Sequence, residues 1–235
     1  MYDCQVVQAR QEGQDRAEPE IQPRVPLSKD RVLRAAVGLA NRDGIESLTM
    51  RKLAQELGVG AMSLYYYVAN KEELLDGMVD IVFSEIDLPL SGVDWKKEMR
   101  QRAISTRETL SRHRWANGLM ENRLRPGPAS VRVHEWVLGC LRKAGFSIET
   151  TLHAYSMLDS YIYGSALQDK TLPFDTTKQS EQVAQMMVQQ ISPDDFPYLA
   201  EMVGGHVSKS GYDSEGEFVF GLDVLLNAIE RFRTT

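Results

Sequence analysis

Cysteine is scarce in this 235-residue chain, which contains only Cys4 and Cys140. One lies near the amino terminus and the other in an apolar stretch, so the pair does not form the framework of a disulfide-stapled fold. We therefore expect a reducing compartment, the cytoplasm. The four histidines are scattered and neither HExxH nor CxxC occurs, so the sequence predicts no metal site and no cofactor.

Long apolar runs and common catalytic motifs are also absent. No run of about 18 apolar residues occurs, so no membrane-spanning helix is predicted. The first 25 residues are polar, and no signal peptide is predicted. Because GxxxxGKS/T, GxGxxG and GxSxG are all missing, nothing in the sequence favours an enzyme.

An excess of positive charge is missing from the chain as a whole. The formal net charge is −6 and the pI is about 5.3, which taken alone argues against a nucleic-acid partner. The charge is unevenly distributed, however. Residues 1–26 are rich in Gln, Glu, Arg and Pro, carry −2, and are predicted to form a disordered arm. Residues 27–71 carry +3, from seven cations and four anions, and residues 72–235 carry −7.

Helical periodicity is what the chain does contain. Ser28, Thr49 and Asn70 are suitable N-cap residues before apolar-periodic stretches, and Gly44 and Gly58 are suitable helix ends. No segment alternates like a strand with hairpin turns. The predicted class is all-α, with a small domain at 27–72 and a larger one at 73–235. Further helices are predicted over 94–112, 116–123, 128–144, 148–168, 178–190, 195–207 and 215–233.

The small domain has the pattern of a helix-turn-helix. Its second and third helices are joined by LGVGA, in which Gly58 can supply the positive φ that the turn needs. Leu64 and Val68 are four residues apart and can pack inward, while small residues at the start of the third helix allow a close approach to a major groove. The local charge of +3 falls on this segment, so we predict that it binds DNA.

The sequence LTMRKLAQELGVGAMSLYYYVANKEELLDGM resembles the DNA-binding segment of the tetracycline-repressor (TetR) family of bacterial transcription factors, over residues 28–78. Residues 94–232 resemble the effector domain of the same family, at Trp95, His113-Arg114, Arg125-Pro126, Ala144-Gly145-Phe146-Ser147, Gly164 and FVFGLDVLLNAIE. The resemblance implies a ligand-responsive regulator, a repressor in most members. It would bind a palindromic double-stranded operator as a homodimer and be released by a small-molecule effector.

The resemblance also implies which side chains contact DNA: Thr49, Arg51, Ala61, Met62, Ser63, Tyr65, Tyr66, Tyr67 and Lys71. Arg51 matches a residue that hydrogen-bonds a guanine edge, and Ala61, Met62 and Ser63 match base-facing positions. The tyrosines and Lys71 match residues that contact the DNA backbone, with Thr49 at the start of the second helix. Other roles stay open: Arg51 in a surface ion pair with Glu56 or another acid, Tyr65 partly in the core, and Lys71 simply solvated.

An effector pocket is implied between the helices at 94–112, 128–144 and 148–168. The matching positions are Arg102, Thr106, Arg125, His134, Val137, Leu152, Tyr155 and Asp159. His134 is alternatively a core histidine, Arg102 a surface residue, and Asp159 the partner of a cation across the dimer. Tetracycline is a poor guess for the ligand, because the places of the family's metal-binding imidazoles fall near Asp87 and Glu121.

The homodimer is implied to form through the helices at 148–168 and 215–233, and the latter carries an apolar stripe of Leu222, Leu225, Leu226 and Ile229. Two other function classes make different predictions. A small-molecule-binding protein that no longer uses DNA would lack an enriched motif among the DNA it binds. An α-helical enzyme would need a nucleophile–base pair or metal-ligand spacing, and the sequence provides neither.

Overall fold

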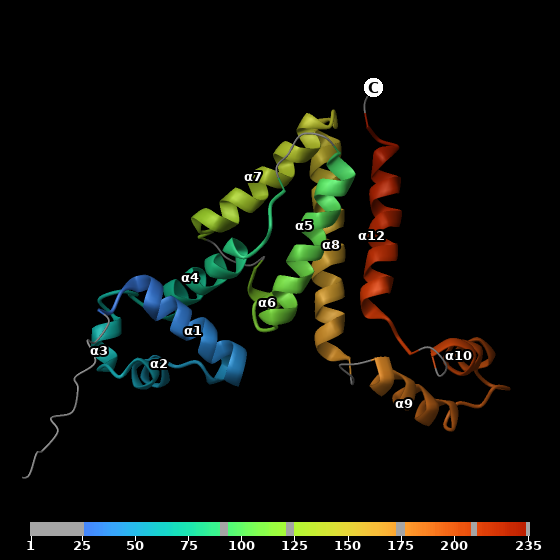
Figure 1. Ribbon diagram of the computed structural model, residues 1–235, viewed down its shortest axis with the longest axis horizontal. Coiled ribbons are helices and arrows are strands. Elements are labelled where there is room, and N and C mark those ends of the chain that lie inside the picture. Colours follow the sequence, from blue (N-terminus) through green and yellow to red (C-terminus); the bar gives the residue numbers. More distant parts are fainter. Residues whose placement is uncertain (1–25, 90–93, 121–124, 173–176, 208–210, 234–235) are drawn as a thin grey trace, which may run out of the picture.

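The computed structural model describes residues 26–89, 94–120, 125–172, 177–207 and 211–233, and every regular element in these ranges is helical (Figure 1). This confirms the predicted all-α class. The predicted arm at 1–26 lies, apart from Pro26, outside the described residues. Within the described ranges no helix is both long and apolar enough to cross a membrane.

The first three helices form a small head. They are α1 (Lys29–Asp43), α2 (Met50–Leu57) and α3 (Ala61–Leu64), with a 3₁₀ turn at Ile45–Ser47. The caps predicted from the sequence are present: Ser28 accepts the Arg31 N–H at 3.2 Å, and Thr49 accepts the Lys52 N–H at 3.1 Å. Gly58 ends α2 with φ 65°, a left-handed conformation that glycine adopts without a Cβ clash. These local signals therefore fix the helix-turn-helix.

The recognition helix α3 is shorter than the sequence predicts. The helical pattern AMSLYYYV continues to Val68, but the structure has one α-helical turn followed by hydrogen-bonded turns at residues 65–67. The backbone N–H groups of Tyr65 and Tyr67 donate to the carbonyl oxygens three residues before them, at 3.3 and 2.9 Å. The Val68 N–H donates to the Leu64 carbonyl at 3.0 Å, and Val68 lies in the core at 1% exposed as its spacing predicts, while Tyr66 is exposed.

A single helix, α4 (Lys71–Ser84), joins the head to the body, and Asn70 caps it by accepting the Glu73 N–H at 2.8 Å. Within the described ranges the body contains seven further α-helices and a π-helical turn: α5 (Trp95–Arg112), α6 (Asn117–Met120), α7 (Pro128–Lys143), α8 (Ile148–Thr171), α9 (Thr177–Val188), α10 (Pro197–Met202), the turn Val203–Val207, and α12 (Ser214–Glu230). The predicted later spans differ from these mainly at their ends.

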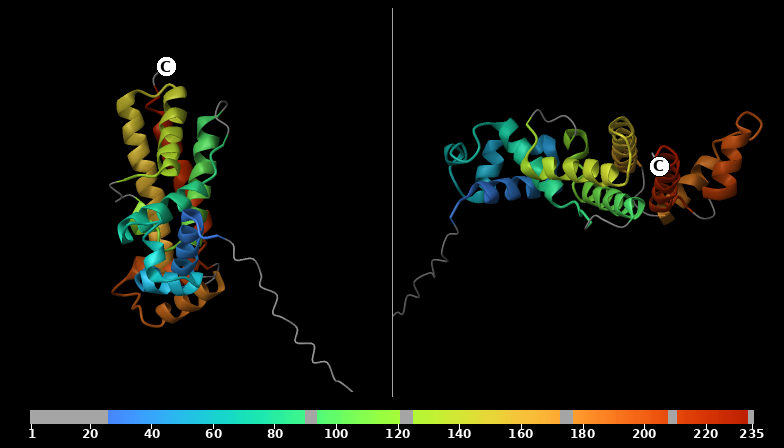
Figure 2. Two further views of the ribbon diagram at one scale, coloured as in Figure 1. Left: turned by 90° about the vertical axis from the view of Figure 1, so that its left-hand side faces the viewer. Right: turned by 90° about the horizontal axis from the view of Figure 1, so that it is seen from above.

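The head and the segment α9–α10 lie at opposite ends of the molecule (Figures 1 and 2). Between them α5, α8 and α12 run alongside one another, and α7 crosses above α4. The hydrophobic core of the head extends along α4 and includes Trp115, Met120, Val133 and Tyr163 of the body. Head and body are therefore packed together through α4.

A second core cluster fills the centre of the body, and it corrects the role expected for the apolar stripe on α12. Leu222, Leu226 and Ile229 are at most 3% exposed in this cluster, and Leu225 packs against it. The stripe predicted for the dimer interface is thus largely the chain's own core, because α12 packs on α5 and α8 within one protomer. The exposed apolar side chains of α12 are Phe220 and Val224, 70% and 53% exposed.

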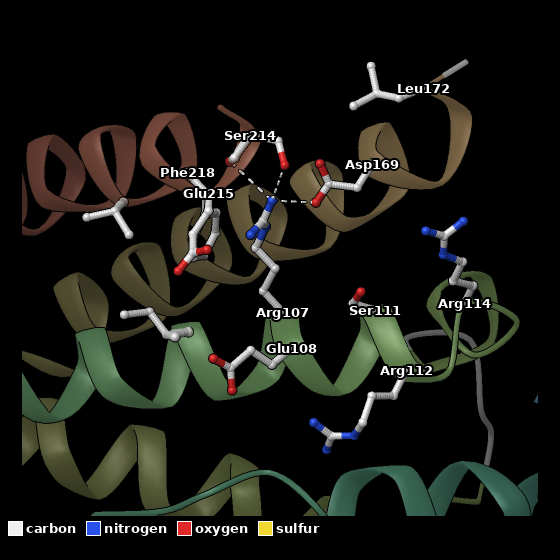
Figure 3. Close-up of a pocket in the computed structure, with 12 residues that line it drawn as sticks. Arg107, Glu108, Ser111, Arg112, Arg114, Asp169, Leu172, Ser214, Glu215 and Phe218 are labelled. Atoms are coloured by element: carbon white, nitrogen blue, oxygen red, sulfur yellow. Dashed lines mark hydrogen bonds and ion pairs between the residues drawn. The ribbon is translucent and has the colours of Figure 1, made fainter. Parts of the chain in front are cut away.

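Arg107 on α5 fastens the ends of two other body helices (Figure 3). Its Nη2 lies 2.6 Å from Asp169 Oδ2 near the end of α8, and it donates to the Ser214 hydroxyl at 2.9 Å at the start of α12. The guanidinium also lies 4.9 Å from the centre of the Phe218 ring. A cavity of about 470 Å³ opens beside this cluster. The Arg107 side chain is only 14% exposed, so solvent screens these contacts weakly.

We expect Arg107→Ala to lower the free energy of unfolding by about 1.5–3 kcal/mol, because charge-assisted hydrogen bonds shielded from water are lost. Arg100→Ala is the matched control. Arg100 also joins α5 to α12, through Asp223 at 2.9 Å, but both partners are more than a third exposed, and such pairs contribute below about 1 kcal/mol. Urea denaturation of both variants at one protomer concentration makes the comparison; equal losses would contradict the role assigned to Arg107.

Candidate nucleic-acid interface and ligand cavity

The outer surface of the head gathers the residues predicted to contact DNA. Seven of the nine are exposed: Thr49, Arg51, Met62, Ser63, Tyr65, Tyr66 and Lys71. Ala61 and Tyr67 are partly buried. Met62 and Tyr66 are 81% and 87% exposed, among the highest values for large apolar side chains in the described residues. The α2–α3 surface therefore has the exposure that a groove-reading surface requires.

Arg51 is available for such a contact. Its nearest alternative partner, Glu56, is instead bound by Arg42 with Nη2 3.1 Å from Oε2, and Asp43 is bound by Lys52 at 2.8 Å. Among the described residues neither Arg51 nor Lys71 takes part in an ion pair. The open ion-pair alternative for Arg51 is thus not what the structure shows.

The three tyrosines differ in burial, and the sequence left open that Tyr65 lies partly in the core. Tyr67, rather than Tyr65, is the one packed against the head core, and its ring meets Tyr66 edge-to-face with centroids 5.2 Å apart. Tyr65 is 46% exposed. The turn that follows α3 accounts for this, because it rotates residue 67 toward the core and residue 66 outward. Tyr66 is thus braced by a partly buried neighbour and keeps its hydroxyl free to reach a phosphate.

Thr49 has two roles that are compatible. Its hydroxyl oxygen accepts the N-cap bond from the Lys52 amide. A hydroxyl carries one proton as well, so the side chain still has a donor for a phosphate oxygen. The first turn of α2 therefore presents Thr49 and Arg51 together on the exposed surface.

A cavity of about 490 Å³ lies in the body, and we call it the ligand cavity. It is bounded by α4, α7, α8 and the segment 125–127. The sequence placed the pocket between α5, α7 and α8, and the structure corrects this: α4 forms the wall that was assigned to α5. The reason is that the side chains of α5 are covered by α8 and α7, whereas the C-terminal half of α4 lies open toward their gap.

Five of the eight predicted pocket residues line the ligand cavity: Arg125, His134, Leu152, Tyr155 and Asp159. Three do not. Val137 is fully buried in the body core, and Thr106 is fully buried and donates its hydroxyl to the Arg102 carbonyl at 2.8 Å. Arg102 lies behind the cavity wall, where it binds Asp159. Their prediction fails because α5 turns Arg102 and Thr106, and α7 turns Val137, into the core.

Arg102 and Asp159 form a buried ion pair within one protomer. Arg102 is 0% exposed and Asp159 is 5% exposed, and Nη1 lies 2.7 Å from Oδ1. Burial alone would lower the pKa of the Arg102 guanidinium, but the Asp159 carboxylate more than offsets this, so the pKa lies above its usual value. This contact differs from the two alternatives left open by the sequence, in which Arg102 is a surface residue and Asp159 pairs with a cation across the dimer.

Aromatic rings line one side of the ligand cavity. His134 meets Phe83 of α4 and Tyr155 of α8 edge-to-face, with ring centroids 5.6 and 5.8 Å apart. Burial lowers the pKa of His134 below its usual value, and Asp159 only partly opposes this. The imidazole is therefore neutral near pH 7. It can donate or accept a hydrogen bond and stack against a flat ligand without adding charge.

Several cavity residues were missed from the sequence: Asp76, Val79, Asp80, Phe83, Met120, Ser130, Ser156, Ser160 and Tyr163. From the sequence, Asp76 and Asp80 of α4 resemble solvated helix residues, because no neighbouring residue indicates which part of α4 faces α7. Of the two positions compared with the metal-binding imidazoles, Glu121 lies outside the described residues. No group of three or more metal-ligating side chains occurs in the described part of the chain.

A helix-turn-helix with an exposed second helix is a motif that places this helix in the major groove of DNA. The family comparison agrees. Residues 32–78 match the model of bacterial regulatory proteins of the tetR family, and residues 88–233 match the tetracyclin repressor-like C-terminal domain. The chain belongs to the tetR family.

Named relatives and solved structures share this assignment. An HTH-type transcriptional regulator of Saccharopolyspora erythraea is 38% identical over 150 residues, which are 63% of this chain and 64% of that relative, so less than two thirds of its length is covered. The class D tetracycline repressor protein of Escherichia coli is 32% identical over 87% of this chain and 89% of that protein. The Streptomyces coelicolor TetR family protein ActR, in complex with actinorhodin, superposes with a TM-score of 0.74 at 27% identity, over 90% of this chain and 100% of that chain.

Proposed function

We propose that this protein is a ligand-responsive transcriptional repressor that binds a palindromic operator as a homodimer and releases it when a small molecule occupies the ligand cavity. The observation that supports this most strongly is the exposed α2–α3 surface, on which Arg51 and Lys71 make no ion pair among the described residues. The head that bears this surface is joined to the body by α4, and α4 also forms a wall of the ligand cavity. Its place of action is the bacterial cytoplasm, where the DNA is. The family is one of regulatory proteins, and no catalytic step is assigned to the chain.

The proposed effector is a flat, polar aromatic molecule other than tetracycline. The cavity supports this with Phe83, His134 and Tyr155 on one side and hydroxyls of Ser156 and Ser160 from α8. ActR has been solved with actinorhodin, and a related repressor with minocycline. Occupancy would shift the population between DNA-binding and non-binding states through the preferred fit of the ligand to one of them.

The test of the whole proposal is selection of bound duplexes from a random-sequence pool by the full chain. We expect an inverted repeat to be enriched, with half-sites one helical turn apart, and affinity that falls steeply as salt is raised. Enrichment of no motif would contradict DNA reading and favour the alternative of a ligand-binding protein that no longer uses DNA.

The proposed dimer face consists of the exposed apolar side chains on α8 and α12: Met157, Leu167, Phe220 and Val224. The two helices pack side by side within the protomer (Figure 1), and we propose that these side chains form one patch. Two such pairs of helices would make a four-helix bundle.

We expect Phe220→Asp together with Val224→Asp to convert the dimer to a monomer, because two buried carboxylates per subunit would face an apolar interface. Val131→Asp is the control: Val131 is 52% exposed, but it lies on α7, outside the proposed face. Sedimentation velocity measures the outcome. A double variant that stays dimeric while folded would place the interface elsewhere.

A further inference from the structure

The N-terminus of α7 has no capping side chain of its own. Its N-cap is Gly127, followed by Pro128, and no side-chain cap bond is made from this position. The N-terminal amides of a helix need acceptors. Here the acceptor comes from another helix: Oδ1 of Asp80 on α4 accepts the Ser130 N–H at 2.9 Å. Ser130 is the third residue of α7, the position that an N-cap side chain normally serves.

Glycine at 127 is what makes this contact possible. A Cβ at this residue would lie 2.2 Å from Asp80 Cγ and 2.7 Å from its Cβ, which no real side chain tolerates. The backbone conformation at Gly127 is ordinary, with φ −79°. The glycine is therefore required by the close approach of Asp80, and α4 and α7 are fitted to each other at this point.

Asp80 also stands between two cavities. It lines the ligand cavity, and it lines a larger groove of about 880 Å³ that runs along α4 to Lys29 and Leu33 at the start of α1. One turn further along α4, Phe83 contacts His134 of α7 inside the ligand cavity. The side chains that hold α4 to α7 are thus the side chains that an occupant would touch, and α4 carries the head.

We infer that Asp80 is the positioning residue that couples the ligand cavity to the orientation of the DNA-reading head. This rests on the proposed function. A ligand that wedges between α4 and α7 competes for the place of the Asp80 carboxylate, so α7 loses its cap and α4 loses its attachment in the same event. The head then has one orientation when the Asp80–Ser130 hydrogen bond is formed and another when this bond is broken.

The test compares Asp80→Ala with Ser147→Ala. Ser147 is the N-cap of α8 and accepts the Thr150 N–H at 3.0 Å, so each variant loses one cap bond, but Ser147 caps its own helix. Both should lower the Tm by a few degrees, roughly 2–4 °C. Only Asp80→Ala should change the affinity for a duplex selected by the wild type, by at least fivefold, and speed amide exchange in α4.

Two further variants sharpen the comparison. Gly127→Ala should behave like Asp80→Ala, since the added methyl group displaces the carboxylate. Asp80→Asn should restore much of the coupling, because its amide oxygen can still accept the Ser130 N–H. Equal duplex affinity and equal α4 exchange in Asp80→Ala and Ser147→Ala would overturn the inference. If the wild type selected no duplex, the proposed function would fail, and exchange in α4 would still decide the role of Asp80.

Discussion

Replacing Asp159 by alanine is expected to lower the free energy of unfolding by about 3–5 kcal/mol, because it leaves a buried arginine without its counter-charge. Arg102 is 0% exposed, and its Nε and Nη2 have no hydrogen-bond partner among the described residues. Asp159 provides the counter-charge, through a hydrogen bond from Nη1. Urea denaturation at a fixed protomer concentration measures the loss, since the stability of a dimer depends on concentration.

Two companion variants show whether burial is the cause. Asp223→Ala breaks the exposed pair with Arg100 and should cost below about 1 kcal/mol. Arg102→Met combined with Asp159→Leu removes both charges and the two unsatisfied nitrogens, so it should recover most of the lost stability. A single Asp159→Ala variant as stable as Asp223→Ala would show that the pair contributes nothing to the fold.

Arg51→Ala is expected to weaken binding to the selected duplex by roughly 30-fold to 10⁴-fold. A bidentate arginine–guanine contact contributes about 1–3 kcal/mol, and a dimer on a palindrome loses two of them, about 2–6 kcal/mol together. The fold should be unaffected, because Arg51 is exposed and makes no ion pair among the described residues. Mobility shift on the selected duplex and on a scrambled duplex separates the lost specificity from general weakening.

Arg34→Ala is the control for charge. Arg34 is exposed on α1 and bound to Asp30 at 2.9 Å, so the head loses one cation without any change in the α2–α3 surface. Its duplex affinity should remain within a few-fold of the wild type. If Arg51→Ala and Arg34→Ala had the same modest effect, Arg51 would contribute only charge, and the base contact would have to be assigned to another residue.

The parts of the fold that follow from local chemistry were predictable. Ser28, Thr49 and Asn70 cap the helices assigned to them, and Gly58 takes the left-handed conformation that the turn demands. Each of these interactions joins residues three or four apart, so the signal lies entirely within one short stretch of sequence. The length of α3 was the local exception: residues 65–67 form hydrogen-bonded turns in place of a continued α-helix, although Leu64 and Val68 are buried as their spacing predicts.

The ligand cavity was predictable only in part. The resemblance supplied Arg125, His134, Leu152, Tyr155 and Asp159, yet it placed the wrong helix beside them. The sequence does not show whether Thr106 on α5 or Val137 on α7 faces a cavity or a core, because their burial depends on the angles at which these two helices meet their neighbours. Asp80 is the clearest omission, because its partner lies 50 residues away.

The sequence by itself determined the helical class, the helix-turn-helix and the concentration of positive charge on residues 27–71 within an acidic chain. All three depend on neighbours along the chain, through periodicity, capping and local charge. The tertiary structure alone decided that α4 walls the cavity, that Arg102 and Asp159 pair within one protomer, and that Asp80 caps α7. Those facts depend on how the helices pack against one another. An apolar or acidic stripe on one helix is compatible with several packing partners until the opposing surface is known.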